Sequence, residues 1–450
     1  MSKTLFSAVL SFVALATLAC SPYTDQPIRS GEIWPDDRGE HINAHGGGIL
    51  CYDNTFYWFG EHKGERSSAA FVGVTCYSSK DLVNWKYEGV ALPVSEDPES
   101  EITSGCVLER PKVIYNEKTG KFVMWFHLEL KGQGYSAARS AVAVSDKVTG
   151  PYTYLGSGRV NPSIMAENIT EEDFAWLDSL TEVPTSWTPE WLEAVSRGLF
   201  FKRDFEGGQM ARDMTLYVDD DGKAYHIYAS EENLTLNIAE LSDDYLSHSG
   251  RYVRVAPAGH NEAPAIFKRN GTYWMITSGC TGWDPNAARM FSAPSIFGPW
   301  EQHPNPCRGD NSEITYGGQS TYILPVPGKK DLYISWPTSG APATRSTPGT
   351  SGFPSSLKRT ALRISNGWTS GISRTTNNRS WRPCRSGYEN RLFQYQPSPV
   401  HQMVVDSGGH YRNRLFCLLS VSDIPERQGS SVPLYRSLHA YLRSAVLWAV

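Results

Sequence analysis

The feature that most constrains the fold is a short unit that recurs along the chain. Each copy places Gly, Asn or Asp at a tight turn and follows it with alternating large residues, a pattern typical of a hairpin that leads into a half-buried strand. The copies are YDNTFYWFGE from Tyr52, NEKTGKFVMWFH from Asn116, DDDGKAYHIYAS from Asp219, RNGTYWMITSG from Arg269 and PGKKDLYISW from Pro327. Five copies of one hairpin indicate a repeated, all-β architecture.

A second element follows most of these copies, and it fits the outer strands of the same units. Its copies are YSSKDLVNWKYEG, AVSDKVTGPYTYLG, ELSDDYLSHSGRYV and SAPSIFGPWEQH. Units of roughly forty to sixty residues with about four short strands each are typical of propeller blades. A β-sandwich would not repeat the same pair of elements so regularly. We therefore expect an all-β, five-bladed β-propeller over residues 21–335, with its last blade incomplete.

One long interruption separates the second and third units, from about Asn161 to Phe205. The segments EEDFAWLDSL and TPEWLEAVSRGLF within it have helical spacing. Thr188, Pro189 and Glu190 together form a helix start signal. We expect a helical insertion between blades two and three, standing on one face of the propeller as a wall of a substrate pocket.

Three acidic residues precede the aromatic strands at similar intervals: Glu109 in CVLERPKVIY, Asp213 in QMARDMTLYV and Glu262 in GHNEAPAIFK. In a propeller these positions fall on the innermost strands, which line the central axis. A cluster of carboxylates is what cleavage of a glycosidic bond requires, because one carboxyl must stay protonated to act on the leaving oxygen. Any one acid alone fits a turn cap or a surface ion pair, but three at one repeat position favour catalysis.

Composition argues against some kinds of partner. The 450 residues carry a net charge of −5, which does not indicate binding to nucleic acid or to an anionic membrane surface. Aromatic residues make up 12% of the chain, which suits rings that stack on sugars, although large β proteins are also rich in them. The chain has no Cys or His spacing typical of zinc and no nucleotide or redox-cofactor motif, so we expect no metal and no cofactor.

The first twenty residues, MSKTLFSAVLSFVALATLAC, have a head that carries Lys3, an apolar core and small residues before Cys20. This pattern is typical of a signal peptide and is too short for a membrane span. The TLAC ending is similar to a bacterial lipoprotein cleavage box, with Thr17 where Leu is usual, and it predicts a lipid on Cys20. Such a lipid would attach the protein to a membrane without crossing it. We expect a location in the bacterial cell envelope, as a periplasmic or outer-membrane lipoprotein, with plain secretion as the alternative.

Longer motifs make a resemblance specific: NAHGGGILCYDNTFYWFGEHKGE, ERPKVIYNEKTGKFVMWFH, RDMTLYVDDDGKAYHIYASEENLT, GHNEAPAIFKRNGTYWMITSGCTGWDPN and GGQSTYILP. From about His41 to Ser335 the sequence resembles glycoside hydrolase family 43, and within it the exo-β-1,3-galactanase branch. The resemblance implies a five-bladed propeller, exo release of galactose from β-1,3-galactan of the arabinogalactan type, and inversion at the anomeric carbon.

The resemblance also implies roles for individual residues. Glu262 matches the general acid, Asp213 matches the carboxylate that tunes and orients this acid, and Glu109 matches a residue that holds the terminal sugar. Weaker matches to the family's pocket predict further substrate contacts at Glu61, His45, Tyr135, Asn233, Thr281 and Trp283. For His45 a structural contact, and for Trp283 a buried position, are the open alternatives.

The expected catalytic base is missing from the first blade. Most members of the family carry an Asp there, whereas this sequence has NAHGGGI, with no carboxylate between Asn43 and Leu50. The galactanase-like branch shares this absence and positions the attacking water with a glutamine, which matches Gln319 in GGQST. A neutral amide is a poor base, so Gln319 would act in its imidic acid form or mainly by positioning the water.

Two other functions are compatible with the same residues. One is a different exo-glycosidase of family 43, acting on arabinofuranosides or xylosides, against which the missing first-blade Asp argues. The other is a non-catalytic glycan-binding surface lipoprotein, which would be favoured if the base is lost and the last blade is open.

The pattern breaks at Trp336, where DLYISW gives way to PTSGAPATRSTPGTSGF. A linker is the simple interpretation, yet no periodic domain follows it. Permitted codons from Trp336 onward, read one base out of frame, give an Asn-Gly turn and an aromatic strand that resemble the family's closing segment. We therefore predict that residues 336–450 are an out-of-frame, poorly ordered tail, which leaves an open ring and makes the activity of this chain uncertain. Codons around Ser335 that exclude the shifted reading would refute this hypothesis.

Overall fold

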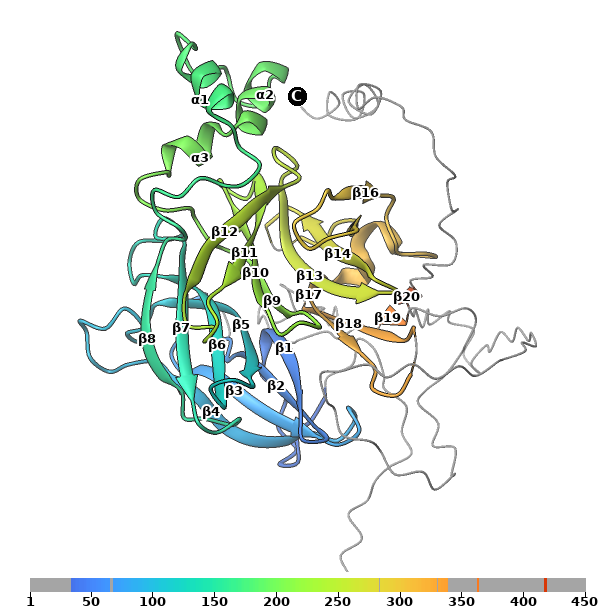
Figure 1. The fold of residues 1–450 in the computed structure, drawn as a ribbon. Helices are drawn as coiled ribbons and strands as arrows, with labels where there is room; N and C mark the ends of the chain where they lie inside the picture. Colours follow the sequence, from blue (N-terminus) through green and yellow to red (C-terminus); the bar gives the residue numbers. More distant parts are fainter. Residues whose placement is uncertain are drawn as a thin grey trace, which may run out of the picture.

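The computed structural model describes residues 34–64, 68–282, 284–329 and 331–338, together with the two-residue strands at 362–363 and 417–418. Its strands form four-stranded sheets that follow one another along the chain (Figure 1). Four sheets are complete blades of antiparallel strands, where the sequence predicted five blades with the last one incomplete. The prediction of an all-β propeller is confirmed.

The first two blades take up the first half of the ring. Their strands are β1 (His45–Tyr52), β2 (Thr55–Glu61), β3 (Gly73–Ser79) and β4 (Lys86–Pro93), then β5 (Val107–Asn116), β6 (Lys121–Glu129), β7 (Arg139–Ser145) and β8 (Thr153–Gly158). Within each blade every strand pairs with the next along the chain, as the tight turns of the repeat predict.

The third and fourth blades repeat this order. Their strands are β9 (Met214–Val218), β10 (Ala224–Ser230), β11 (Thr235–Leu241) and β12 (His248–Val255), then β13 (Asn261–Arg269), β14 (Thr272–Gly279), β15 (Arg289–Ala293) and β16 (Glu301–His303). A 3-10 helix, η1 (Ser312–Gly317), leads into β17 (Gln319–Pro325), which pairs with β18 (Tyr333–Thr338). The same sheet also contains the short strands β19 (Leu362–Arg363) and β20 (Cys417–Leu418).

The first strand of every sheet faces the centre of the ring. Around the ring, β1 contacts β5, β5 contacts β9, β9 contacts β13, β13 contacts β17, and β17 contacts β1 again. Apolar clusters fill the space between adjacent sheets, as expected when both faces of each sheet must be buried. The innermost strands therefore form a closed ring, and the prediction of an open ring does not hold for them.

The closure of the ring involves the residues where the sequence pattern breaks. Trp336 lies in β18, is buried and packs edge-on against Trp58 of β2, with 5.4 Å between ring centroids. The strand continues to Thr338, so the predicted end of the propeller at Ser335 falls three residues too early. The remainder of the predicted tail, apart from β19 and β20, lies outside the described residues.

Three helices lie between β8 and β9: α1 (Glu171–Asp178), α2 (Pro189–Arg197) and α3 (Leu199–Arg203). We call residues 161–205 the helical segment. It leaves and rejoins the propeller at one point, because the backbones of Val160 and Gln209 pair with each other on either side of it. Figure 1 shows its helices projecting from one side of the ring.

Local capping explains why these helices begin and end where they do. Thr170 caps α1 in a capping box with Asp173. Thr188 caps α2 by accepting a hydrogen bond from the backbone of Trp191, with Pro189 in the first turn, and Gly198 ends it with a φ of 105°. The helical start read from the sequence at Thr188 is thus where α2 begins.

The sequence also predicts a signal peptide and a lipid on Cys20, and no membrane-spanning segment. The signal peptide and Cys20 precede residue 34 and lie outside the described residues. In the part of the chain that the structure describes, no helix is long and apolar enough to cross a membrane.

Candidate active site

The predicted site residues gather on one face of the ring, and the up-and-down order of the strands explains why. When innermost strands begin on one face, that face also receives the connections from one blade to the next and those between second and third strands. Gln319 and Glu262 begin innermost strands on this face, and Asp213 directly precedes one. Tyr135 and Asn233 lie in connections between second and third strands. Residues far apart in sequence are brought together in this way.

A backbone irregularity turns the side chains of the innermost strands toward the site. The strand register shifts between Glu109 and Lys112 in β5, and between Glu262 and Ala265 in β13, as β-bulges do. Similar shifts occur near the starts of β1 and β17. Arg110 follows the first glutamate with a φ of 57°, a left-handed conformation that is unfavourable for a side chain of this size. Bulges of this kind commonly re-aim a side chain next to an active site.

Glu262 is held where its carboxyl tends to keep a proton. Gln319 Nε2 donates a hydrogen bond to Glu262 Oε1 at 2.7 Å, and Asn233 Nδ2 lies 3.4 Å from Glu262 Oε2. Burial and then the negative charge of Asp213 raise the pKa of Glu262 to about 7, although Arg110 acts in the opposite direction. This carboxyl can therefore be protonated or ionised near neutral pH.

Asp213 and Arg110 form an ion pair that connects three blades. Arg110 donates from Nε to Asp213 Oδ1 at 3.0 Å and from Nη2 to Oδ2 at 2.8 Å, the bidentate geometry that guanidinium and carboxylate groups favour. Asp213 Oδ2 also accepts a hydrogen bond from the backbone of Ala263, the residue next to Glu262. The pair thus fixes the carboxylate of Asp213 beside the acid whose pKa it raises.

Gln319 is held at both ends of its side-chain amide. Its Nε2 donates to Ser278 Oγ at 2.8 Å as well as to Glu262, and its Oε1 accepts from Arg110 Nη2. A second nitrogen of the Arg110 guanidinium donates to the backbone oxygen of Ser320 at 3.0 Å. These contacts fix which end of the amide faces Glu262 and which faces Arg110.

Glu109 has the opposite surroundings. The hydroxyl of Tyr135 donates to Glu109 Oε1 at 2.9 Å, Lys63 Nζ lies 3.4 Å from the same oxygen, and His127 Nδ1 lies 3.4 Å from Oε2. Burial alone would raise the pKa of Glu109, but His127 and Lys63 outweigh it and lower the pKa well below its usual range. Glu109 therefore remains a carboxylate at neutral pH.

His127 lies directly across from Glu109 in the β5–β6 pair and is fully buried. Its Nε2 is 2.8 Å from Glu129 Oε1, while Glu129 Oε2 accepts a hydrogen bond from the backbone of Ala138. Burial lowers the pKa of His127, but the two carboxylates outweigh this and raise it to about 9. The imidazole is therefore a buried cation between two acids.

Glu61 and His45 extend this network into the first blade. His45 Nδ1 is 2.5 Å from Glu61 Oε1, and Lys63 Nζ is 3.2 Å from Glu61 Oε2. Lys63 therefore bridges Glu61 and Glu109, and the two carboxylates raise its pKa although burial lowers it. Both predicted contacts from blade one are therefore joined to the predicted sugar-binding acid through Lys63.

Two predicted residues are not brought to this centre. Thr281 is exposed, and its hydroxyl donates to the backbone oxygen of Asp284 and accepts from Asn286, so its contacts serve its own loop. Trp283 lies outside the described residues. The remaining predicted residues, from five different sheets and their connections, belong to one connected set of contacts or directly adjoin it.

A cavity of about 450 Å³ opens beside the cluster. It is lined by Tyr135, Arg212 and Glu232 among others, and each of these touches or directly precedes a residue of the site. Arg212 donates hydrogen bonds to Glu232 Oε2 and to the backbone oxygen of Tyr135. These bonds link the connections of blades two and three along the side of the cavity. Within the described residues, no group of three or more His, Cys, Asp and Glu side chains is placed to hold a metal ion.

The sequence did not single out several residues that shape the site: Lys63, Arg110, His127, Glu129 and Ser278. Counting back from the turn between β5 and β6 would place His127 opposite Arg110, and it is the bulge between Glu109 and Lys112 that brings it opposite Glu109. The contacts of Arg110 join residues more than one hundred positions apart in sequence and follow only from the closed ring.

The matching family model is that of the glycosyl hydrolases family 43, over residues 190–345. A solved family-43 β-1,3-galactosidase with galactodeoxynojirimycin is 53% identical, covers 77% of this chain and 99% of its own, and superimposes with a TM-score of 0.70. An exo-β-1,3-galactanase from Clostridium thermocellum is 33% identical, over 75% of this chain and 62% of that one, with a TM-score of 0.58.

Two fungal proteins are also similar. An exo-β-1,3-galactanase from Phanerochaete chrysosporium, solved with β-1,3-galactotriose, is 33% identical over 70% of this chain and 60% of that one, with a TM-score of 0.54. A curated β-D-galactofuranosidase from Aspergillus niger is 30% identical over 129 residues. The chain spans 37% of the length of that curated relative, and about three fifths of the two galactanase chains.

Proposed function

The chain belongs to family 43 of the glycosyl hydrolases, and we propose that it releases galactose from the non-reducing ends of β-1,3-galactan by inverting hydrolysis. The observation that carries this proposal is the contact between Glu262, with its pKa near 7, and the amide of Gln319. The similar solved structures described as β-1,3-galactosidases and exo-β-1,3-galactanases support the choice of substrate.

In this proposal Glu262 is the general acid. Its carboxyl proton passes to the glycosidic oxygen as the bond to the anomeric carbon breaks, while Gln319 Nε2 and Asn233 Nδ2 hold the carboxyl in place. Asp213 contributes by its charge, which favours the protonated form of Glu262 in the free enzyme. Arg110 keeps the carboxylate of Asp213 in place through two hydrogen bonds.

Gln319 positions the attacking water through its amide oxygen. An amide oxygen accepts two hydrogen bonds, so Oε1 can hold a water hydrogen in addition to the bond from Arg110. The guanidinium donor opposes the imidic acid form, because that form would place a proton on the same oxygen. The water oxygen bonds to the anomeric carbon on the face opposite the leaving group and loses its proton to solvent, which later reprotonates Glu262.

Glu109 grips the terminal galactose. A carboxylate that stays ionised accepts hydrogen bonds from sugar hydroxyls, and it is already oriented by Tyr135, Lys63 and His127. Glu61 and His45 lie on the far side of Lys63 and form the adjoining wall. An ionised carboxylate that binds the terminal sugar on one side of the scissile bond, and a protonated acid on the other side, suit cleavage at the end of a chain.

The test is release of galactose from linear β-1,3-galactan, followed by proton NMR to identify the first anomer formed. We expect α-galactose from the β-linked substrate, and loss of release in Glu262→Gln. The assay uses the chain as given and a second version with the reading frame restored after Ser335. Binding of galactan without release in both versions would instead support a glycan-binding module.

We further propose that β17 and β18 are the inner half of a fifth blade, whose outer strands are encoded in the shifted frame. Support comes from the contacts of β17 with both β13 and β1 and from the apolar cluster shared by the first and last sheets. We also propose that a lipid on Cys20 attaches the mature protein to the cell envelope, on the strength of the TLAC motif. Labelling with radioactive palmitate, abolished in Cys20→Ala, tests the anchor.

A further inference from the structure

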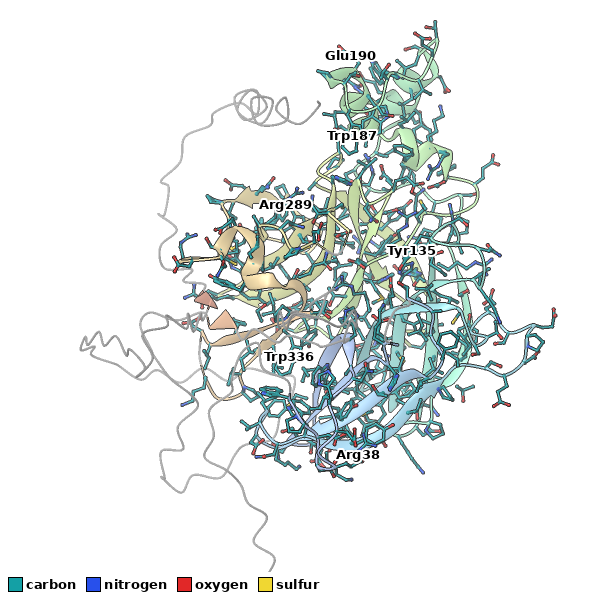
Figure 2. The ribbon with its side chains drawn as sticks, turned by 180° about the vertical axis from the view of Figure 1, so that it is seen from behind. Arg38, Tyr135, Trp187, Glu190, Arg289 and Trp336 are labelled. Carbon is teal, nitrogen blue, oxygen red and sulfur yellow. The ribbon has the colours of Figure 1, made fainter. Side chains whose placement is uncertain are left out.

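An exposed tryptophan lies on the face that carries the site and is not used by the mechanism above. The helical segment is a connection from one blade to the next, so it rises from the face on which the innermost strands begin. Trp187 lies in this segment, immediately before the capping residue Thr188 of α2. The residue is 59% exposed, and Figure 2 shows it at the foot of the helices, on the side toward the sheets.

The ring of Trp187 is held by two neighbours. Its centroid lies 5.1 Å from that of Trp191 in the first turn of α2, and 5.2 Å from the imidazole of His260. The contact with Trp191 resembles a hydrophobic staple, in which the residue before a helix cap packs on the first turn. A staple alone would not require contact with His260 or leave the residue more than half exposed.

His260 connects Trp187 to the catalytic acid. It stands two residues before Glu262, a separation that the chain spans with at most about 7 Å. The backbone of this connection is fixed, because Arg289 Nη1 donates to the carbonyl oxygens of Gly259 and His260 at 2.7 and 2.8 Å. The indole therefore has a definite place beside the start of β13.

The backbone of Trp187 is strained. Its φ of 70° lies in the left-handed region, which a bulky residue rarely adopts. Strain of this kind persists only where surrounding contacts impose it, and it tends to occur at sites of function. Here the strained residue is exposed and keeps its indole against His260, two residues before Glu262.

We infer that Trp187 is a stacking platform for a galactopyranose unit on the leaving-group side of the scissile bond. The inference rests on the proposed function, since Glu262 protonates the leaving oxygen and the leaving sugars must therefore extend past this acid. The axial C4 hydroxyl of galactose leaves one face of its ring lined with C–H groups, and such a face packs on the flat surface of an indole. Glu109, which grips the terminal sugar, belongs to another blade.

The inference predicts a dependence on chain length. In Trp187→Ala the ratio of kcat/KM for β-1,3-galactotetraose to that for β-1,3-galactobiose falls roughly tenfold, mainly through KM for the longer substrate. Val183→Ala is the matched control, because Val183 lies in the same loop, is exposed to a similar degree and has no ring contact with His260 in the part of the chain that the structure describes. We expect the control to keep the wild-type ratio.

Two further measurements separate this role from a structural one. Thermal unfolding shows whether Trp187→Ala loses the stabilising contact with Trp191. The variant Trp187→Phe keeps an aromatic face and should disturb folding less than Trp187→Ala does. A lower Tm with the wild-type ratio would overturn the platform. Restoration of most of the ratio by Phe would support it.

Binding by calorimetry tests the platform independently of turnover. In the background of Glu262→Gln, the Kd for galactotetraose should rise roughly tenfold when Trp187→Ala is added, with little change for galactose. If the wild-type chain releases no galactose but this difference in Kd is found, the proposed reaction is wrong, and Trp187 is a stacking platform for the bound glycan without a leaving-group side. Equal affinities with and without Trp187, or no binding of galactotetraose, would overturn the platform.

Discussion

Two glutamates occupy equivalent places in the second and fourth blades and differ in almost everything else. Glu109 and Glu262 each lie at the start of an innermost strand, directly before a residue with positive φ and a shift of register. The residue across the sheet is His127 for the first and Ser278 for the second. The pKa of Glu109 is lowered and that of Glu262 is raised to about 7.

The difference shows that the fold supplies the position and the neighbours supply the chemistry. Glu109 is surrounded by Lys63, His127 and the hydroxyl of Tyr135, all of which favour its charge. Glu262 has the carboxylate of Asp213 nearby and only neutral hydrogen-bond partners. One repeat position thus provides an acceptor for sugar hydroxyls in one blade and a proton donor in another.

The largest effect should come from removing the two carboxyl groups in turn. Glu262→Gln should lower kcat for galactan by roughly a thousandfold, because the proton donor is lost. Glu109→Gln should act mainly through a higher KM, because the grip on the terminal sugar is weakened while the acid remains. Steady-state kinetics check both, with circular dichroism as the control for folding. Equal losses of kcat in the two variants would contradict the division of roles.

A second prediction concerns the buried cation beside Glu109. The pKa of His127 is raised in the folded protein to about 9, so its stabilising effect is present below pH 6.5 and is lost as the pH rises through 9. We expect His127→Gln to lower the free energy of unfolding by up to about 3 kcal/mol at pH 6. Urea unfolding from pH 6 to 10 measures this.

The contrast between wild type and His127→Gln is what decides this prediction, since other groups titrate in the same range. The difference in the free energy of unfolding between the two proteins should shrink as the pH rises from 6.5 through 9. A difference that stays constant over this range would show that the imidazole is not charged in the folded protein.

A smaller effect is expected from the charge that tunes the acid. Asp213→Asn removes the negative charge that raises the pKa of Glu262 and leaves Arg110 without its anionic partner. Both changes lower the pKa of Glu262, so the fall of kcat/KM that occurs near pH 7 in the wild type should move to lower pH. A profile that moves to higher pH, or not at all, would contradict the role given to Asp213.

More of the fold than of the site could be predicted from the sequence. The turn-and-strand repeat predicts the order and pairing of the strands, because each hairpin is local, and Thr188 marks the start of α2. The prediction of an open ring was wrong for the innermost strands. The packing of Trp336 against Trp58 joins the two ends of the propeller, and a contact so distant in sequence produces no local sequence pattern.

Within the site, the sequence found the acids but not what sets their charge. The repeat position identified Glu109, Asp213 and Glu262, whereas the pKa of each glutamate depends on residues from other strands and blades. Arg110 stands next to a predicted acid, yet its partners lie in the third and last sheets. The hairpin register counted from the turn would place His127 opposite Arg110, and the bulge in β5 that brings it opposite Glu109 could not be predicted from the sequence.

The most direct test of this account is an NMR titration of glutamate side chains labelled with carbon-13 at the carboxyl carbon. Comparison with Glu262→Gln and Glu109→Gln assigns the two signals. We predict that the Glu262 signal titrates with a midpoint near pH 7, while that of Glu109 remains in the carboxylate position down to pH 4. Two signals that titrate together near the ordinary pKa of glutamate would contradict the claim that equivalent positions carry opposite chemistry.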